Sequence, residues 1–185
     1  MVRKENNFYF VIGLILIASF SRIIPHYPNF TPIISIALFG GKYFQNKNLA
    51  LFLPVIILWF SDLIINNLIQ DYYKTFTFIY PGFYWQYISI LIISFIGVFN
   101  LKKISILKLL GTSIFSSVIF FLISNFGVWQ SGTLYSKSIT GLIACYIAAI
   151  PFFYGTLVSS IIYTYSLFGI YKFLFENNLK FKAFK

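Results

Sequence analysis

Residues 107–128 read LKLLGTSIFSSVIFFLISNFGV, an apolar run in which Lys108 is the only charged residue. A helix needs about 20 consecutive, mostly apolar residues to cross the hydrocarbon core of a membrane. This run is long enough, and further apolar runs precede and follow it. The sequence therefore predicts an all-α, polytopic membrane protein, one domain over 1–185. Its six transmembrane helices are expected at 8–24, 31–44, 48–65, 83–99, 107–128 and 151–175.

The composition argues against a soluble domain. Hydrophobic residues make up 59% of the 185 positions and charged residues only 10%, whereas soluble domains carry roughly 25% charged residues. The net charge of +10 does not indicate nucleic-acid binding, because the basic residues are scattered between apolar runs rather than gathered on one face. One cysteine, Cys145, and one histidine, His26, offer no multi-cysteine or histidine metal site, so neither a metal nor a cofactor is expected.

Two apolar segments are shorter than a typical span. Residues 31–44 are predicted either to lie deep among their neighbours or to continue a little past Phe44. Residues 139–150 are apolar but too few to cross a membrane. They are predicted to form a short helix at the outer leaflet, separated from the last span by Pro151, while Pro54 inside the third span predicts a kink.

The basic residues predict the orientation, since cytoplasmic loops of membrane proteins hold the excess of lysine and arginine. With the N-terminus inside the cell, the cytoplasmic group is the larger one and both termini are cytoplasmic. This group comprises Arg3, Lys4, Lys42, Lys47, Lys102, Lys103, Lys108, Lys172, Lys180, Lys182 and Lys185. The external group comprises Arg22, Lys74 and Lys137.

A candidate binding site follows from this orientation, because polar groups that are distant in sequence are expected together at the outer end. Ionisable side chains within spans cost roughly 2.5 to 3.5 kcal/mol each on insertion, so they are usually paired or functional. Arg22 and Asp62 are natural partners, and this pairing is favoured over an alternative in which Arg22 extends to the membrane surface and Asp62 only bounds a helix. The predicted site comprises Arg22, His26, Asn29, Asp62, Phe121, Asn125 and Trp129. The last three are four residues apart on one face of the fifth span.

Familiar catalytic motifs do not occur in the sequence. Residues 40–42 read GGK, but they lack the earlier glycine and the following Ser or Thr of a phosphate-binding loop. There is no G-x-S-x-G and no H-E-x-x-H, and no nucleophile is evident within reach of His26. A non-enzymatic function is therefore expected.

The candidate site residues also lie in strings that resemble a family of small, uncharacterised bacterial membrane proteins. The strings are RIIPHYPNFTP at 22–32, LFGG at 38–41, SDL at 61–63, NFGVW at 125–129 and GLIACYIAAIPFF at 141–153. This family is in turn distantly similar to the substrate-binding S components of energy-coupling-factor (ECF) vitamin transporters, which have six spans and bind a small molecule near the outer face. The resemblance implies a bacterial cytoplasmic (inner) membrane protein, with a transmembrane coupling subunit and ATPases as partners.

Together, the site and the resemblance favour binding and uptake of a small organic solute, of the vitamin or vitamin-precursor class, with energy from partner subunits. Arginine, aspartate, asparagine, histidine and tryptophan side chains suit a planar or zwitterionic solute. Two alternatives stay open: a structural or assembly protein with no small-molecule site, and a membrane enzyme that uses His26 and Asp62 as acid and base. The expected partners are the solute, the lipid bilayer and the coupling subunits, without nucleic acid.

Single cysteines in a Cys145→Ser background test the orientation. A cysteine in place of Lys182 is expected to stay unreactive toward a membrane-impermeant maleimide in intact cells, because that end faces the cytoplasm. A cysteine in place of Lys137 is expected to react. Labelling of position 182 in intact cells would overturn the predicted orientation.

Overall fold

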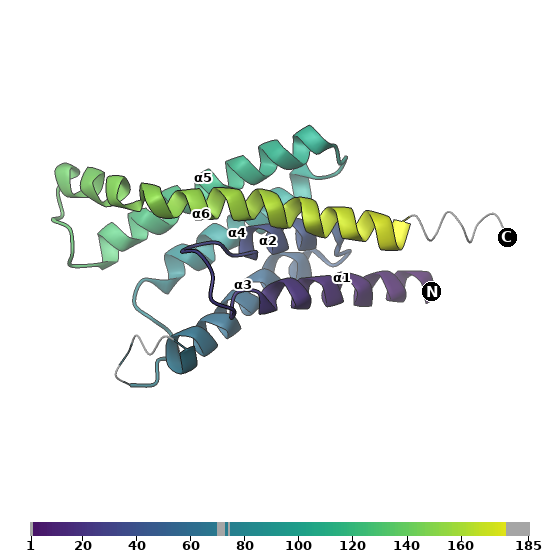
Figure 1. Ribbon diagram of the computed structural model, residues 1–185, viewed down its shortest axis with the longest axis horizontal. Helices are drawn as coiled ribbons and strands as arrows, with labels where there is room; N and C mark the ends of the chain where they lie inside the picture. The colour runs from purple at the N-terminus through teal and green to yellow at the C-terminus, as the bar shows by residue number, and fades with distance from the viewer. Residues whose placement is uncertain (1, 70–72, 74, 177–185) are drawn as a thin grey trace.

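The computed structural model describes residues 2–69, 73 and 75–176, and these residues form a bundle of helices with no β-strand among them (Figure 1). The helices are α1 (Val2–Phe20), α2 (Ile33–Tyr43), α3 (Lys47–Ile64), α4 (Phe83–Asn100), α5 (Ile106–Ser131) and α6 (Ile139–Tyr171). One π-helical turn, η1 (Ile65–Ile69), extends α3, and another, η2 (Lys172–Glu176), extends α6. We call the end where α1 begins and α6 ends the Lys172 end, and the end where α1 ends and α6 begins the Arg22 end.

The lengths of the helices divide them into two groups. Within the described residues, four helices are long and apolar enough to cross a membrane, namely Lys47–Ile69, Phe83–Asn100, Ile106–Ser131 and Ile139–Leu174. The apolar part of α1, Phe8–Phe20, and the whole of α2 are shorter. The all-helical architecture predicted from the sequence is confirmed, whereas four of the six predicted spans have the length and composition of a crossing.

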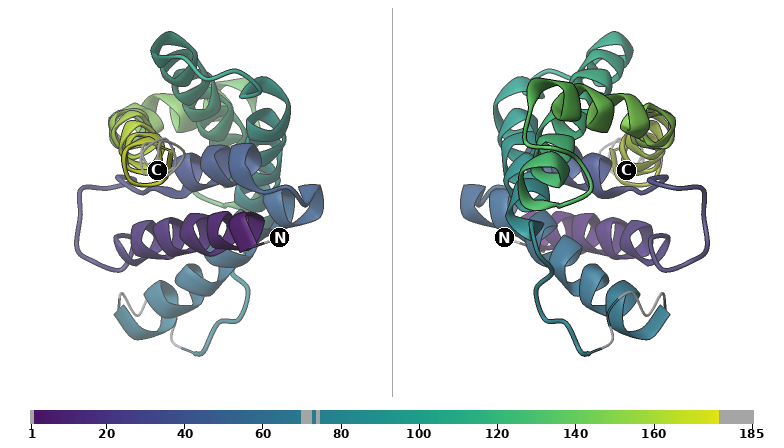
Figure 2. Two further views of the ribbon diagram at one scale, coloured as in Figure 1. Left: turned by 90° about the vertical axis from the view of Figure 1, so that its right-hand side faces the viewer. Right: turned by 90° about the vertical axis from the view of Figure 1, so that its left-hand side faces the viewer.

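The shortest helix, α2, lies at the centre of the bundle. Residues 33–41 are all buried, and α2 contacts each of the other five helices. Figure 2 shows it between α1 on one side and the later helices on the other. Its 11 residues span about 16 Å, roughly half the thickness of a hydrocarbon core. Of the two arrangements predicted for this segment, the structure has the one in which it lies deep among its neighbours.

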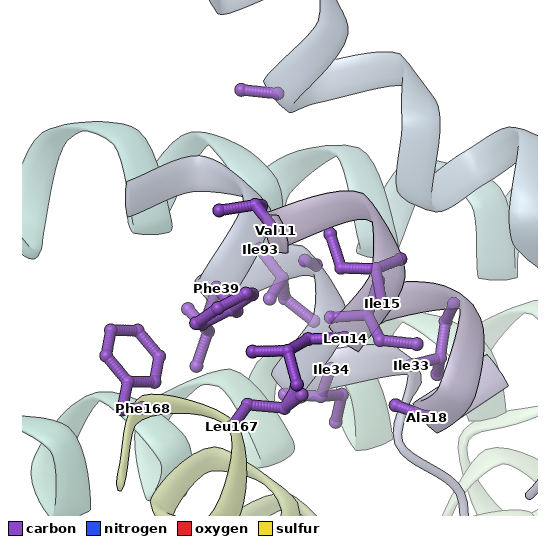
Figure 3. Close-up of a cluster of buried hydrophobic side chains, with 14 of the residues drawn as sticks. Val11, Leu14, Ile15, Ala18, Ile33, Ile34, Phe39, Ile93, Leu167 and Phe168 are labelled. Atoms are coloured by element: carbon purple, nitrogen blue, oxygen red, sulfur yellow. The ribbon is translucent and has the colours of Figure 1, made fainter. Parts of the chain in front are cut away.

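The hydrophobic core forms around α2. Branched aliphatic side chains of α1, α2 and α4 meet Leu167 and Phe168 of α6, and Phe39 of α2 packs edge-on against Phe168 with ring centroids 5.3 Å apart (Figure 3). Most of the exposed large hydrophobic side chains lie on the other helices, as expected where lipid rather than water is the solvent.

The helices α2 and α4 cross at a contact between two glycines. A Cβ atom on Gly41 would lie 2.8 Å from the backbone of Gly97, and a Cβ atom on Gly97 would lie 2.9 Å from the carbonyl oxygen of Leu38. Small residues of this kind allow the backbones of membrane helices to approach closely. The pair GG at 40–41, which does not complete a phosphate-binding loop, therefore has a packing role.

Hydroxyl groups connect α2 to α5 and α6 through a buried network. The Ser35 hydroxyl donates to the carbonyl oxygen of Ser160 at 2.9 Å, and the Thr164 hydroxyl donates to Ser35 Oγ at 2.9 Å. The hydroxyls of Ser117 and Ser160 lie 2.7 Å apart. Each such bond between membrane helices contributes about 0.6 kcal/mol on average. Ser35, inside the apolar and buried stretch 33–41, thereby fixes the rotation of α2 against α6.

The prediction of a separate short helix at 139–150 is wrong. α6 runs without interruption from Ile139 to Tyr171 and holds Pro151 inside it. A proline removes one backbone hydrogen bond, but neighbouring helices and local adjustments make this tolerable in membrane helices. Here α5 packs along α6 and supports it. The 33 residues of α6 rise about 50 Å, so a straight crossing of a 30 Å core would leave part of this helix outside it.

The basic side chains separate between the two ends of the bundle. Lys42, Lys47, Lys102, Lys103, Lys108 and Lys172 belong to helix ends and turns at the Lys172 end, and Arg22 and Lys137 to the Arg22 end. Lys74, Lys180, Lys182, Lys185 and the side chains of Arg3 and Lys4 lie outside the described part of the structure. The two groups match the predicted cytoplasmic and external groups, and the assignment of each end to a side of the membrane stays a prediction.

Matched alanine substitutions test the glycine contact. Gly97→Ala is expected to lower the free energy of unfolding by about 1 to 3 kcal/mol, because the added methyl group must displace the backbone of α2. Gly111→Ala on α5 places the same methyl group in open space and is expected to change stability by no more than about 1 kcal/mol, in the stabilising direction. Reversible unfolding in detergent micelles measures both. Equal effects of the two substitutions would contradict the close α2–α4 contact.

Candidate functional site

The Arg22 side chain is positioned by the way α1 ends. After Phe20 the chain makes three successive tight turns, in which the N–H groups of Ser21, Arg22 and Ile23 each donate to the carbonyl oxygen three residues earlier at 3.1 Å. The α-helix therefore ends four residues before the predicted boundary at 24. After these turns, the Arg22 side chain lies against α3 instead of extending along α1.

The guanidinium group of Arg22 binds three groups on α3. Its Nη2 donates to Asp62 Oδ1 at 2.8 Å, and its Nη1 donates to the Leu58 carbonyl oxygen at 3.3 Å and to the Ser61 hydroxyl. These three residues share one helix face because they are three and four positions apart. The Arg22 and Asp62 side chains are only 10% and 12% exposed. The predicted ion pair is present, and the Arg22 side chain does not extend to the surface as in the alternative prediction.

Burial makes the two charges dependent on each other. An isolated charge in a low-dielectric environment is costly, and removing one partner of a buried pair typically destabilises a protein by about 3 to 5 kcal/mol. Arg22 Nε is itself buried and has no hydrogen-bond partner among the described residues. The guanidinium is thus neutralised by Asp62 but keeps one N–H group available for another acceptor.

Phenol groups lie on the other side of the carboxylate. The Tyr87 hydroxyl donates to Asp62 Oδ2 at 3.4 Å, and the Tyr80 hydroxyl donates to Gln86 Oε1 at 2.8 Å. Tyr80 lies in the turn before α4, where burial, and secondly the charge of Asp62, raise the pKa of its phenol. Tyr80 therefore stays protonated and keeps its donor at physiological pH.

Arg22 lies in the walls of three cavities in the described part of the chain. The first measures about 450 Å³ and is lined by Arg22, Asp62, Asn66, Tyr73, Tyr80 and Gln86. The second measures about 550 Å³, lies along the segment 22–31 and is also lined by Ile65, Ile69 and Phe152. The third, of about 80 Å³, shares Gln86 with the first cavity and Asn29 and Thr31 with the second. We call these spaces the Arg22 cavities.

His26 and Asn29 both line the second cavity, as part of the segment that joins α1 to α2. Nδ1 of the exposed His26 lies 2.8 Å from the Tyr27 carbonyl oxygen. Asn29 has a left-handed backbone with a φ of 58°, a conformation that asparagine tolerates better than most residues. The segment packs on α6 at Gly155, where a Cβ atom would overlap the Pro28 carbonyl oxygen.

Phe121, Asn125 and Trp129 line none of the Arg22 cavities. The amide of Asn125 donates to the Phe121 carbonyl oxygen of its own helix at 2.8 Å, and Trp129 Nε1 donates to the Ser136 carbonyl oxygen at 2.9 Å. The Phe121 ring packs against Phe153 of α6, with centroids 4.9 Å apart. These three residues lie at the α5–α6 contact, because α5 turns this face toward α6. Their expected depth in the membrane does not reveal how α5 is rotated about its own axis.

The structure adds residues that the sequence analysis did not select. Asn66, Tyr80 and Gln86 line the first Arg22 cavity, and Tyr87 binds Asp62. The sequence contains an indication of Gln86, because a buried amide in the apolar run 83–99 is costly unless it forms hydrogen bonds. Among the described residues, no group of three or more His, Cys, Asp or Glu side chains gathers as metal ligands would.

A bundle of apolar helices, four of them long and apolar enough to cross a membrane, with a buried ion pair at one end, indicates a polytopic helical membrane protein. The chain belongs to a family of unknown function (DUF6580), whose model matches residues 3–183. No curated protein and no solved structure matches it. The function is therefore argued from the site.

A double-mutant cycle tests the coupling of Arg22 and Asp62. Each of Arg22→Ala and Asp62→Ala is expected to lower stability by about 3 to 5 kcal/mol, because each leaves a buried charge without its partner. The double variant should lose less than the sum, with a coupling of about 0.5 to 3 kcal/mol. Unfolding in detergent measures the cycle.

The control cycle pairs Asp62→Ala with Lys137→Ala. Lys137 donates to carbonyl groups near the end of α5 and shares no partner with Asp62. Its effects should add to those of Asp62 within about 0.5 kcal/mol. Additivity of Arg22 and Asp62 to the same degree would contradict the ion pair.

Proposed function

We propose that the protein binds a small organic solute in the Arg22 cavities and takes part in its uptake, in the manner of an S component energised by partner subunits. The observation that carries the proposal is the position of the buried Arg22–Asp62 pair in the walls of these cavities. A pair used only to hold α1 against α3 would not need open polar space beside it. In this proposal the Arg22 end faces the outside of a bacterial cytoplasmic membrane.

The walls favour a polar solute with both hydrogen-bond donors and acceptors. The first cavity offers the amides of Asn66 and Gln86 and the phenol of Tyr80, and the buried Nε of Arg22 is an unused donor nearby. Its volume of about 450 Å³ lies within the range of roughly 300 to 1,000 Å³ for small-molecule sites. A planar or zwitterionic compound of vitamin size fits this combination of charge, amide and ring.

The two alternatives have less support. His26 is exposed and lines a different cavity from the one lined by Asp62, so the acid and base of a membrane enzyme are not assembled in one space. A purely structural role has one favourable observation, namely that Arg22 already has three partners within the protein. The structural role differs from solute binding in a measurable way, because it requires no ligand.

Co-purification tests the proposal. The protein is purified in a mild detergent, its small molecules are extracted, and each compound enriched over a membrane protein purified in parallel is identified by mass spectrometry. Arg22→Lys keeps the charge but loses the planar two-point contact, so retention should fall about tenfold while the fold is kept. The identified compound is then tested for uptake into cells that carry the protein.

Two asparagines provide the matched comparison. Asn66→Ala removes an amide from the first Arg22 cavity and should reduce retention, whereas Asn125→Ala removes an amide that binds its own helix and should not. If no compound is enriched, and no member of a panel of planar and zwitterionic compounds raises the unfolding temperature, the proposal fails and the structural role stands.

A further inference from the structure

The helix α2 begins beside the third Arg22 cavity, and its N-terminus is buried. Its N-cap residue is Pro32, whose side chain has no oxygen that could accept a hydrogen bond. The first bond within the helix is made by the Ile36 N–H, which donates to the Pro32 carbonyl oxygen at 2.9 Å. The N–H groups of residues 33–35 precede this bond and receive no acceptor from the N-cap side chain, although these residues are only 3%, 2% and 0% exposed.

Arg22 brings a second unused donor to the same cavity. Ile33 and Ile34, the first residues of α2, line the third cavity together with Arg22. The Arg22 side chain is 10% exposed, and its buried Nε has no hydrogen-bond partner among the described residues. Buried N–H groups in proteins are almost always paired. Donors from two separate segments of the chain therefore meet at one space that lacks an acceptor for them.

The other polar groups in the wall do not supply this acceptor. The Thr156 hydroxyl donates to a carbonyl oxygen of its own helix at 3.3 Å, and the Gln86 amide oxygen already accepts from a phenol at 2.8 Å. Asn29 and Thr31 each carry both a donor and an acceptor, so they leave the balance unchanged. Asp62 lines the first cavity but not the third. An occupant of the third cavity must therefore bring acceptors with it.

The charge and the size of the third cavity favour a carboxylate. The N-terminus of a helix attracts anions, and a guanidinium group forms its strongest hydrogen bonds with them. The cavity is the most enclosed of the three and measures about 80 Å³, more than the roughly 10–15 Å³ that one water needs. It is too small for a whole solute, for which sites measure roughly 300 to 1,000 Å³. The neighbouring first cavity, which shares Arg22 and Gln86 with it, has that size.

We infer that the third Arg22 cavity is the carboxylate subsite of the solute site, so that the solute is a carboxylic acid whose oxygens bind the start of α2 and the Arg22 Nε. The inference rests on the proposed function, because it assigns the carboxylate to the solute. The guanidinium then lies between the solute carboxylate and Asp62, and the helix N-terminus adds the positive charge that the second carboxylate requires. The body of the solute occupies the first cavity, with its donor groups toward Asp62.

A matched pair of small probes tests the subsite without knowledge of the whole solute. Fluoroacetate carries the carboxylate, and fluoroacetamide has nearly the same shape without the charge. Binding of each to the purified protein in detergent is measured from the broadening of its fluorine NMR signal, with the ionic strength held constant by chloride. Fluoroacetate is expected to bind with a Kd of about 1 to 10 mM and to be displaced by acetate, and fluoroacetamide about tenfold more weakly.

Two substitutions assign the binding to the third cavity. Thr156→Leu puts a larger side chain into the cavity wall and should weaken fluoroacetate binding at least about tenfold. Thr140→Leu, the same change at an exposed position of α6, should leave the binding unchanged. Arg22→Lys keeps the charge but removes Nε and should weaken binding about tenfold. Where Arg22→Lys disturbs the fold, Thr156→Leu decides alone, because the cavity offers room for the added atoms.

The results distinguish failure of the inference from failure of the proposed function. Equal binding of fluoroacetate and fluoroacetamide, or no binding of either, would show that the cavity holds only water and would overturn the inference. Fluoroacetate binding that is the same in Thr156→Leu and Thr140→Leu would place the anion elsewhere and overturn it too. A co-purified solute without an acidic group would overturn the inference and leave the proposed function intact. If no solute is retained at all, the proposed function fails and the inference fails with it.

Discussion

The enclosure of α2 is the constraint on which the rest of the structure depends. An 11-residue helix cannot present a continuous apolar cylinder across a membrane, so its two polar ends must be covered by protein. Five other helices surround it, and the close approach at Gly41 and Gly97 brings α4 near enough to complete this cover. The hydroxyl of Ser35 then fixes how α2 is rotated against α6.

The two polar sites follow from this central helix. The segment that leads into α2 must return from the end of α1, and in doing so it places Arg22 against α3 and packs Pro28 on Gly155 of α6. At its other end α2 stops beside the start of α5, where Lys42 and Lys172 line a cavity of about 460 Å³. A short helix buried at the centre thus has a polar space at each of its ends, one of them around an ion pair.

The helices and the ion pair can be predicted from the sequence, because both depend on local features, namely apolar runs and the rare ionisable residues within them. Apolar runs limit where helices lie, and one arginine and one aspartate inside such runs have few partners besides each other. The rotation of α5 about its own axis is not a local property, so the sequence does not reveal that Asn125 and Trp129 line none of the Arg22 cavities. Pro151 was read as a helix end because its tolerance depends on support from α5, which only the packing shows. Gln86 gives a weaker signal in the sequence than Arg22 or Asp62, because it is a single amide without a charge.

The order of the helices along the chain has a consequence for biosynthesis. α2 leaves the ribosome early, when only α1 and then α3 are at hand, whereas α4, α5 and α6, which cover most of it, are made last. Until α6 emerges, Ser35 has neither Ser160 nor Thr164 to bind, and the glycine face of α2 lacks α4 until that helix has been made. The set of contacts that encloses α2 can therefore be completed only after the last helix, α6, has been made.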